Sequence, residues 1–62
     1  MKLQYGDTFY FEDLVLANFD IISWTEDRLA AISEQGKYCI FQSDGGRWRL
    51  IAVEHSLLQL KQ

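Results

Sequence analysis

Cys39 and His55 are the two side chains whose chemistry suits a nucleophile and a general base. A thiol nucleophile needs a histidine and an orienting group within hydrogen-bond reach. The 62-residue chain has one cysteine and one histidine. Cys39 stands in the apolar run Tyr38-Cys39-Ile40-Phe41, which is typical of a buried, unreactive cysteine. We therefore predict that the protein is not an enzyme of this kind.

Other sites of chemistry are no better supported. The carboxylate pairs Glu12-Asp13 and Glu26-Asp27 are sequence neighbours, whose side chains point apart on a strand, and both suit turns or helix caps. One cysteine rules out an intrachain disulfide and makes a structural zinc site improbable. The stretch 44–47 lacks the glycine spacing of phosphate-binding loops. We predict no catalytic residue, no cofactor and no metal.

Arg47-Trp48-Arg49 is the one stretch that suggests nucleic-acid binding. Arginines contact phosphates, and an exposed indole stacks on a base. In the alternative interpretation, Trp48 covers an end of the core while Arg47 pairs with Asp44. Tryptophan and arginine are also favoured at protein interfaces. With a net charge of −3, the chain lacks the basic footprint of typical nucleic-acid binders, so we do not expect direct binding.

Charge is unevenly distributed along the chain. Residues 1–27 hold six acidic residues and one basic residue, a net charge of −5, whereas residues 28–62 carry +2. An acidic half suits a basic partner, or a protein that imitates DNA and occupies a DNA-binding protein. The candidate interaction surface comprises Arg47, Trp48, Arg49, Glu12, Asp13, Asp20 and Trp24.

The stretch 37–54 predicts a β-hairpin around the turn residues Asp44, Gly45 and Gly46. Glycine tolerates the positive φ that two-residue hairpin loops require. With Gly45 and Gly46 as the loop, the predicted cross-strand pairs are Asp44 with Arg47, Phe41 with Leu50, Ile40 with Ile51, Cys39 with Ala52, and Lys37 with Glu54.

The rest of the chain divides into short apolar segments. Alternation predicts a strand at 1–5, and a run of β-forming residues predicts a second at 8–11. The stretch 14–24 fits helical spacing in part and strand alternation in part. The segment 25–36 is either a helix capped by Thr25 or a hairpin with Gly36 at a left-handed position. Near the C-terminus, 54–56 suggests a turn, and 57–60 a last strand or one helical turn.

These segments predict one small domain, 1–62, of mainly β structure. We expect an antiparallel meander of four to six strands, as an SH3-like barrel or an open sheet. Any helix should fall at 25–35 or 14–19, and the alternative is an α+β fold with a helix at about 25–35 packed on the hairpin. The Leu3–Asp7 opening and the short terminal strand resemble those of SH3-like barrels. The resemblance is architectural and covers the chain only loosely.

Size and hydrophobicity suggest a partner. A domain this short without disulfide or metal is marginally stable. The runs 50–53 and 14–16 are apolar on both sides, which predicts covering by another subunit and favours a homodimer. No signal peptide or membrane-spanning segment is evident, and a single free cysteine suits the cytoplasm. We expect a small non-enzymatic protein–protein interaction module, an inhibitor or accessory subunit, with a nucleic-acid-directed protein as the alternative.

Overall fold

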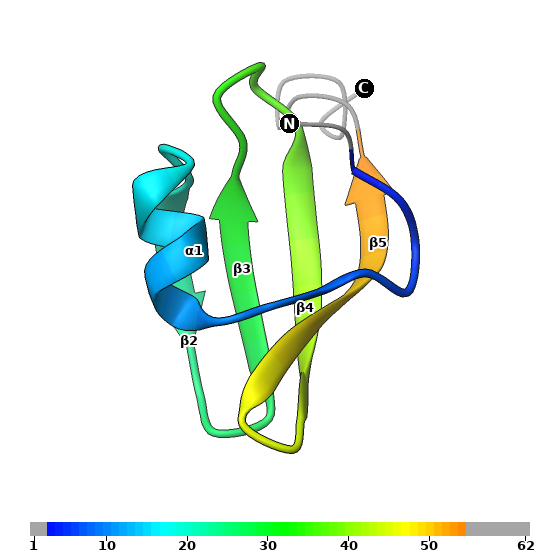
Figure 1. The fold of residues 1–62 in the computed structure, drawn as a ribbon. Helices are drawn as coiled ribbons and strands as arrows, with labels where there is room; N and C mark the ends of the chain where they lie inside the picture. The colour runs from blue at the N-terminus through cyan, green and yellow to red at the C-terminus, as the bar shows by residue number, and fades with distance from the viewer. Residues whose placement is uncertain (1–2, 55–62) are drawn as a thin grey trace.

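The structure is a computed structural model and describes residues 3–54. These residues form one antiparallel sheet and one short helix (Figure 1). The elements are β1 (Thr8–Phe9), α1 (Phe11–Leu16), β2 (Asp20–Trp24), β3 (Arg28–Ile32), β4 (Tyr38–Asp44) and β5 (Arg47–Glu54). The five strands lie in the order β1-β5-β4-β3-β2. The prediction of a mainly β fold is confirmed.

Within residues 3–54 the sheet is open and has one covered face. Strands β1 and β2 are its two edges, and each pairs with a single neighbour, so the open-sheet form of the prediction is the one observed. In Figure 1, α1 and the segment leading into it lie in front of the sheet. Among residues 3–54, no helix or strand lies behind it.

The core lies between the sheet and α1. Leu14 of α1 and Phe19 contact alternate residues of the strands, which are Leu29, Ala31, Cys39, Phe41 and Leu50. Phe41 is fully buried and makes edge-on ring contacts with Phe9 and Phe19, at centroid distances of 5.9 and 5.8 Å. Edge-to-face packing of this kind adds to the stability from area burial. Phe41 is therefore the centre of the hydrophobic core.

The β4–β5 hairpin has the predicted turn and a different register. Gly45 and Gly46 have φ of 59° and 88°, as a mirror-image turn requires. The pairs Asp44–Arg47 and Phe41–Leu50 are observed as predicted. Beyond them Ile51 is an extra residue, a β-bulge.

The bulge moves every later pair by one residue. Ile40 pairs with Ala52, Cys39 with Val53, and Tyr38 with Glu54. The predicted pairs Ile40–Ile51, Cys39–Ala52 and Lys37–Glu54 are therefore wrong. The bulge has a packing consequence, because Leu50 and Val53 both contact the core although they are an odd number of residues apart.

The segment 25–36 is a hairpin, and the alternative of a helix at 25–35 is wrong. Thr25 does cap the start of the segment, but its hydroxyl accepts the N–H groups of Asp27 and Arg28 in a tight turn at 3.2 and 3.1 Å. Gly36 has a φ of 89° in the next turn. Between them β3 is bonded to strands on both sides, and this tertiary pairing overrides the helical propensity of its alanines.

The N-terminal third differs most from prediction. The described part of the predicted strand 1–5 has no strand structure, although the Gly6 N–H donates to the Leu50 carbonyl at 2.9 Å. The strand predicted at 8–11 ends at Phe9, because α1 begins at Phe11 and not at Leu14. The Tyr10 N–H donates to the Asp13 carboxylate at 3.0 Å, which closes the first turn of α1.

Helix α1 ends before the predicted Phe19, because Asn18 takes the left-handed conformation with φ of 65°. No helix within residues 3–54 is long and apolar enough to cross a membrane. The segments predicted at 54–56 and 57–60 extend into residues outside the described part of the chain.

Candidate interaction face

The uncovered face of the sheet carries its own ordered pattern of side chains. Successive residues of a strand point to opposite faces, so residues that alternate with the core positions lie here. We call this surface the open face. The strand registers arrange it in three rows, which are Asp20-Ile32-Tyr38-Glu54, then Ser23-Ala30-Ile40-Ala52, then Arg28-Gln42-Arg49.

The central row is apolar across β3, β4 and β5. Ile40 and Ala52 are half-buried and Ala30 is buried, and none of the three belongs to the core cluster. A second β-bulge lies in β2, where Ile22 is the extra residue between Ile21 and Ser23. The bulge residues Ile22 and Ile51 lie at the two ends of the row and are 47% and 39% exposed. Apolar side chains on an uncovered sheet face form a patch of the kind that marks interaction sites.

The outer rows give the open face opposite charges at its two ends. The row at one end of the open face has Asp20 and Glu54 as its outermost residues. The row at the other end has Arg28 and Arg49 as its outermost residues. All four residues are exposed. Arg49 also forms an ion pair with Asp44. The open face is therefore an apolar centre between an acidic end and a basic end.

Of the sequence-predicted site residues, Asp20, Arg47 and Arg49 belong to the open face, where Arg47 pairs with Asp44 beyond the Arg28-Gln42-Arg49 row. Arg47 lies beside the entry to α1, with its guanidinium 4.9 Å from the centroid of the Tyr10 ring. It also donates hydrogen bonds to the Tyr10 hydroxyl at 3.2 Å and to the Thr8 hydroxyl at 3.4 Å. Its side chain is thus held within the molecule by three interactions.

Trp48 is half-buried and packs against the core cluster. It pairs with Phe9 of β1 and Ser43 of β4. Its neighbours Arg47 and Arg49 alternate with it along β5. The two guanidinium groups therefore lie on the open face, and the indole lies on the covered face. The structure does not bring these three residues together on one surface.

Glu12, Asp13 and Trp24 lie at α1 and the end of β2. Trp24 is 59% exposed, and its ring centroid lies 5.1 Å from that of Phe11 at the start of α1. The side chain of Asp13 accepts the Tyr10 N–H, so it serves the helix cap. Glu12 is exposed beside it. This group is on the covered side of the sheet, apart from the open face.

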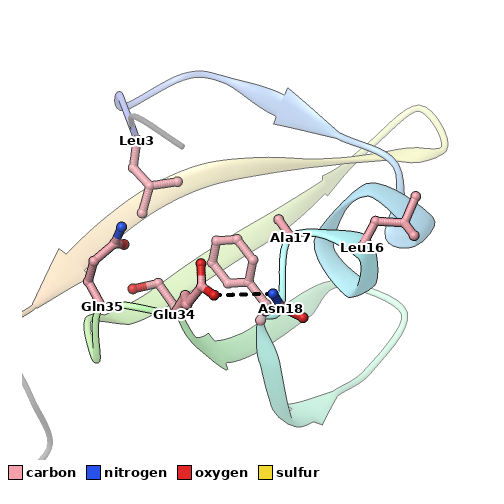
Figure 2. Close-up of a pocket in the computed structure, with 8 residues that line it drawn as sticks. Leu3, Leu16, Ala17, Asn18, Glu34 and Gln35 are labelled. Atoms are coloured by element: carbon pink, nitrogen blue, oxygen red, sulfur yellow. Dashed lines mark hydrogen bonds between the residues drawn. The ribbon is translucent and has the colours of Figure 1, made fainter.

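A pocket of about 180 Å³ lies between the α1–β2 turn and the β3–β4 turn (Figure 2). The Asn18 amide donates to the Glu34 carboxylate at 3.2 Å across it, and Leu3 approaches from the N-terminal segment. Pockets for small organic ligands typically measure about 300–1,000 Å³. This pocket is smaller, and the hydrogen bond between Asn18 and Glu34 across it joins the two turns.

Cys39 is fully buried in the core. Desolvation by burial raises the pKa of its thiol, and the nearby Lys37 opposes this shift without cancelling it. The thiol donates a weak hydrogen bond to the Lys37 carbonyl at 3.6 Å. A raised pKa keeps the thiol protonated and unreactive at neutral pH. The geometry therefore gives Cys39 a packing role, and its suggested partner His55 lies outside the described residues.

Sequence reasoning missed the residues that form the centre of the open face. Ile40, Ala30 and Ala52 have the residue types of ordinary strands. The two β-bulges, at Ile22 and Ile51, have no distinctive residue pattern in the sequence. The apolar run 50–53 was the available indication that a second face of β5 needs a cover. No protein-family model, curated protein or solved structure matches the chain.

Proposed function

We propose that the protein is a small non-enzymatic interaction module that binds another protein through the open face. The observation that carries this proposal is the apolar central row, whose side chains are left out of the core although the row spans the long strands of the sheet. In a domain this small, apolar area left in water is a substantial loss of stabilisation, at roughly 25 cal/mol per Å². Covering this face on binding recovers that free energy.

The pattern of the open face supports a protein partner over a nucleic acid. Nucleic-acid surfaces combine basic residues with aromatic stacking groups, and phosphate contacts dominate their affinity. Here the centre is aliphatic, one end is acidic, and Arg49 already pairs with Asp44. A hydrophobic centre with a polar rim is instead the usual arrangement of a protein–protein interface.

The proposal includes an accessory or inhibitory role in the cytoplasm. The support for that compartment is the buried free thiol of Cys39, since proteins of reducing compartments keep cysteines unpaired. The support for an accessory role is size, because a single sheet of this extent offers one binding face.

The experiment is an affinity capture from a lysate of the native host, with the wild type and two variants as separate baits. Binding is then measured again with purified proteins. The wild type is compared with Ile40→Lys on the open face and with Leu16→Lys on α1, where Leu16 is 80% exposed. Any protein recovered is then purified and titrated against each variant. We expect Ile40→Lys to weaken binding at least about 30-fold, as for an interface hot spot, and Leu16→Lys to bind like wild type.

Two results would overturn the proposal. One is a purified partner that binds wild type and Ile40→Lys equally well while Leu16→Lys has lost binding. The other is a salt-sensitive complex with single-stranded oligonucleotides that is lost on Trp48→Ala with the fold intact, because that outcome assigns the function to nucleic acid.

A further inference from the structure

We infer that the open face binds a second copy of the same chain, as a two-fold dimer in which two sheets pack face to face with their strands antiparallel. This inference rests on the proposed function, because it names the partner of the same face. It is carried by the charge pattern of the face together with its apolar centre.

For two sheets packed face to face, the two-fold axis lies in the plane between them, either parallel or perpendicular to the strands. The two choices place opposite combinations of charges against each other. A two-fold axis parallel to the strands would set the acidic end of one copy on the acidic end of the other. An axis perpendicular to the strands reverses the strand direction and keeps β2 over β2 and β5 over β5. Asp20 at the start of β2 then faces the region of the partner's Arg28, and Glu54 faces the partner's Arg49. Only the second arrangement is complementary.

The same axis brings the two central rows together. Face-to-face sheets pack about 10 Å apart, with the side chains of the two inner faces interdigitating. On this axis Ile40 of one copy meets Ile40 of the other at the centre of the contact, and the small side chains of Ala30 and Ala52 lie on either side of that pair. Ile22 and Ile51 extend the apolar contact at the two ends of the row.

The first test is sedimentation equilibrium of the purified full chain, with no other protein present. We expect a species of twice the 7.3 kDa chain mass at micromolar concentration, and a melting temperature that rises with protein concentration. Ile40→Lys should weaken dimerisation at least about 30-fold, whereas Leu16→Lys should leave it unchanged.

The second test uses charge reversal at exposed positions, which leaves the core intact. Asp20→Lys and Arg28→Glu should each weaken the dimer, because each sets like charges against the partner. The double variant should regain the wild-type dissociation constant to within about threefold, since the introduced lysine then meets the introduced glutamate across the interface. Within one chain the two sites lie about 13 Å apart along the strands, beyond the screening length of ~8 Å at physiological salt. Recovery therefore reports a contact between chains.

The outcomes separate this inference from the proposed function. A monomer at all concentrations, or a dimer indifferent to Ile40→Lys and to both charge reversals, overturns the inference of a second copy. If the chain is monomeric but Ile40→Lys abolishes binding of a captured, purified foreign protein, the proposed function stands with a different partner. A monomer whose partner binding is insensitive to Ile40→Lys overturns both.

Discussion

The two faces of the sheet use the same strands and differ in what covers them. On one face Phe41 and its neighbours are enclosed by α1 and Phe19. On the other, Ile40 is the next residue along β4 and is left outside the core. Both faces are apolar at the centre, so hydrophobicity alone does not determine which one is the core. The covering element determines it, and a chain of this length has only one short helix within residues 3–54 with which to cover a face.

The largest expected effect tests whether the two faces differ in stability. Phe41→Ala removes the centre of the core and should lower the free energy of unfolding by about 3–5 kcal/mol, enough to unfold much of the protein. Ile40→Ala on the open face should cost about 1–2 kcal/mol, since its side chain is half-buried. Urea unfolding of both variants at low protein concentration measures the difference. Equal losses would show that the open face is part of the folding core.

The hairpin turn serves both faces, so damage there should affect them together. Gly46 has φ of 88°, a conformation strongly disfavoured for a β-branched residue. Gly46→Val should destabilise the fold by about 1–3 kcal/mol. Gln42→Val, in the middle of β4 on the open face, is the control and should cost little. The same unfolding assay applies, and a neutral Gly46→Val would contradict the assigned turn.

The thiol of Cys39 allows the two faces to be compared by reactivity. Burial keeps its pKa raised in the folded state, so the neutral thiol is the favoured form there. The stabilisation is fully present below the thiol pKa of the unfolded chain and is lost as pH rises through the higher folded pKa. The free energy of unfolding should thus decline at alkaline pH, and Cys39→Ala should remove this part of the slope.

A thiol reagent completes that comparison. Native Cys39 should react at least about tenfold more slowly than the unfolded chain, because it is both buried and protonated. A cysteine introduced by Ile40→Cys in the Cys39→Ala background should react rapidly when the protein is dilute. Rapid reaction of native Cys39 would show that the covered face opens to solvent.

The smallest expected effect concerns the ion pair between Arg49 and Asp44. Both side chains are nearly half exposed. Asp44→Asn should change the free energy of unfolding by no more than about 0.5 kcal/mol, as for other surface pairs. Thermal melts at low and high salt measure this change. A loss above about 1 kcal/mol would indicate that Asp44 supports the turn in another way.

The sequence predicted the elements whose formation depends on local chemistry. The glycines at 45 and 46 specify the turn that the structure has. Thr25 and Gly36 fit both a capped helix and a hairpin, and the pairing of β3 with strands on both sides decides between the two. The sequence did not predict the positions at which pairing between strands overrides local conformational preference. The β-bulge at Ile51 is set by the need to direct both Leu50 and Val53 to the core, which requires knowing which face the helix covers.

The candidate site shows the same limit more strongly. Arginine and tryptophan attract attention in a sequence, but Trp48 packs on the core and Arg47 on Tyr10. The residues of the open face are ordinary alanines and isoleucines, and they become a site only because three strands align them in a row. Their charged neighbours come from three different strands, β2, β3 and β5. Such a pattern depends on register, which the bulges conceal from sequence reasoning.

The most direct test of the account is solvent accessibility of individual methyl groups by NMR, with a soluble paramagnetic agent at low and high protein concentration. We predict that the methyl signals of Ile40 and Ala52 are strongly broadened in dilute protein and protected at high concentration. The methyl signals of Leu16 should be broadened at both, and those of Leu29 at neither. Open-face methyl signals whose broadening is independent of concentration, together with protection appearing at Leu16, would contradict the assignment of the open face as the interaction surface.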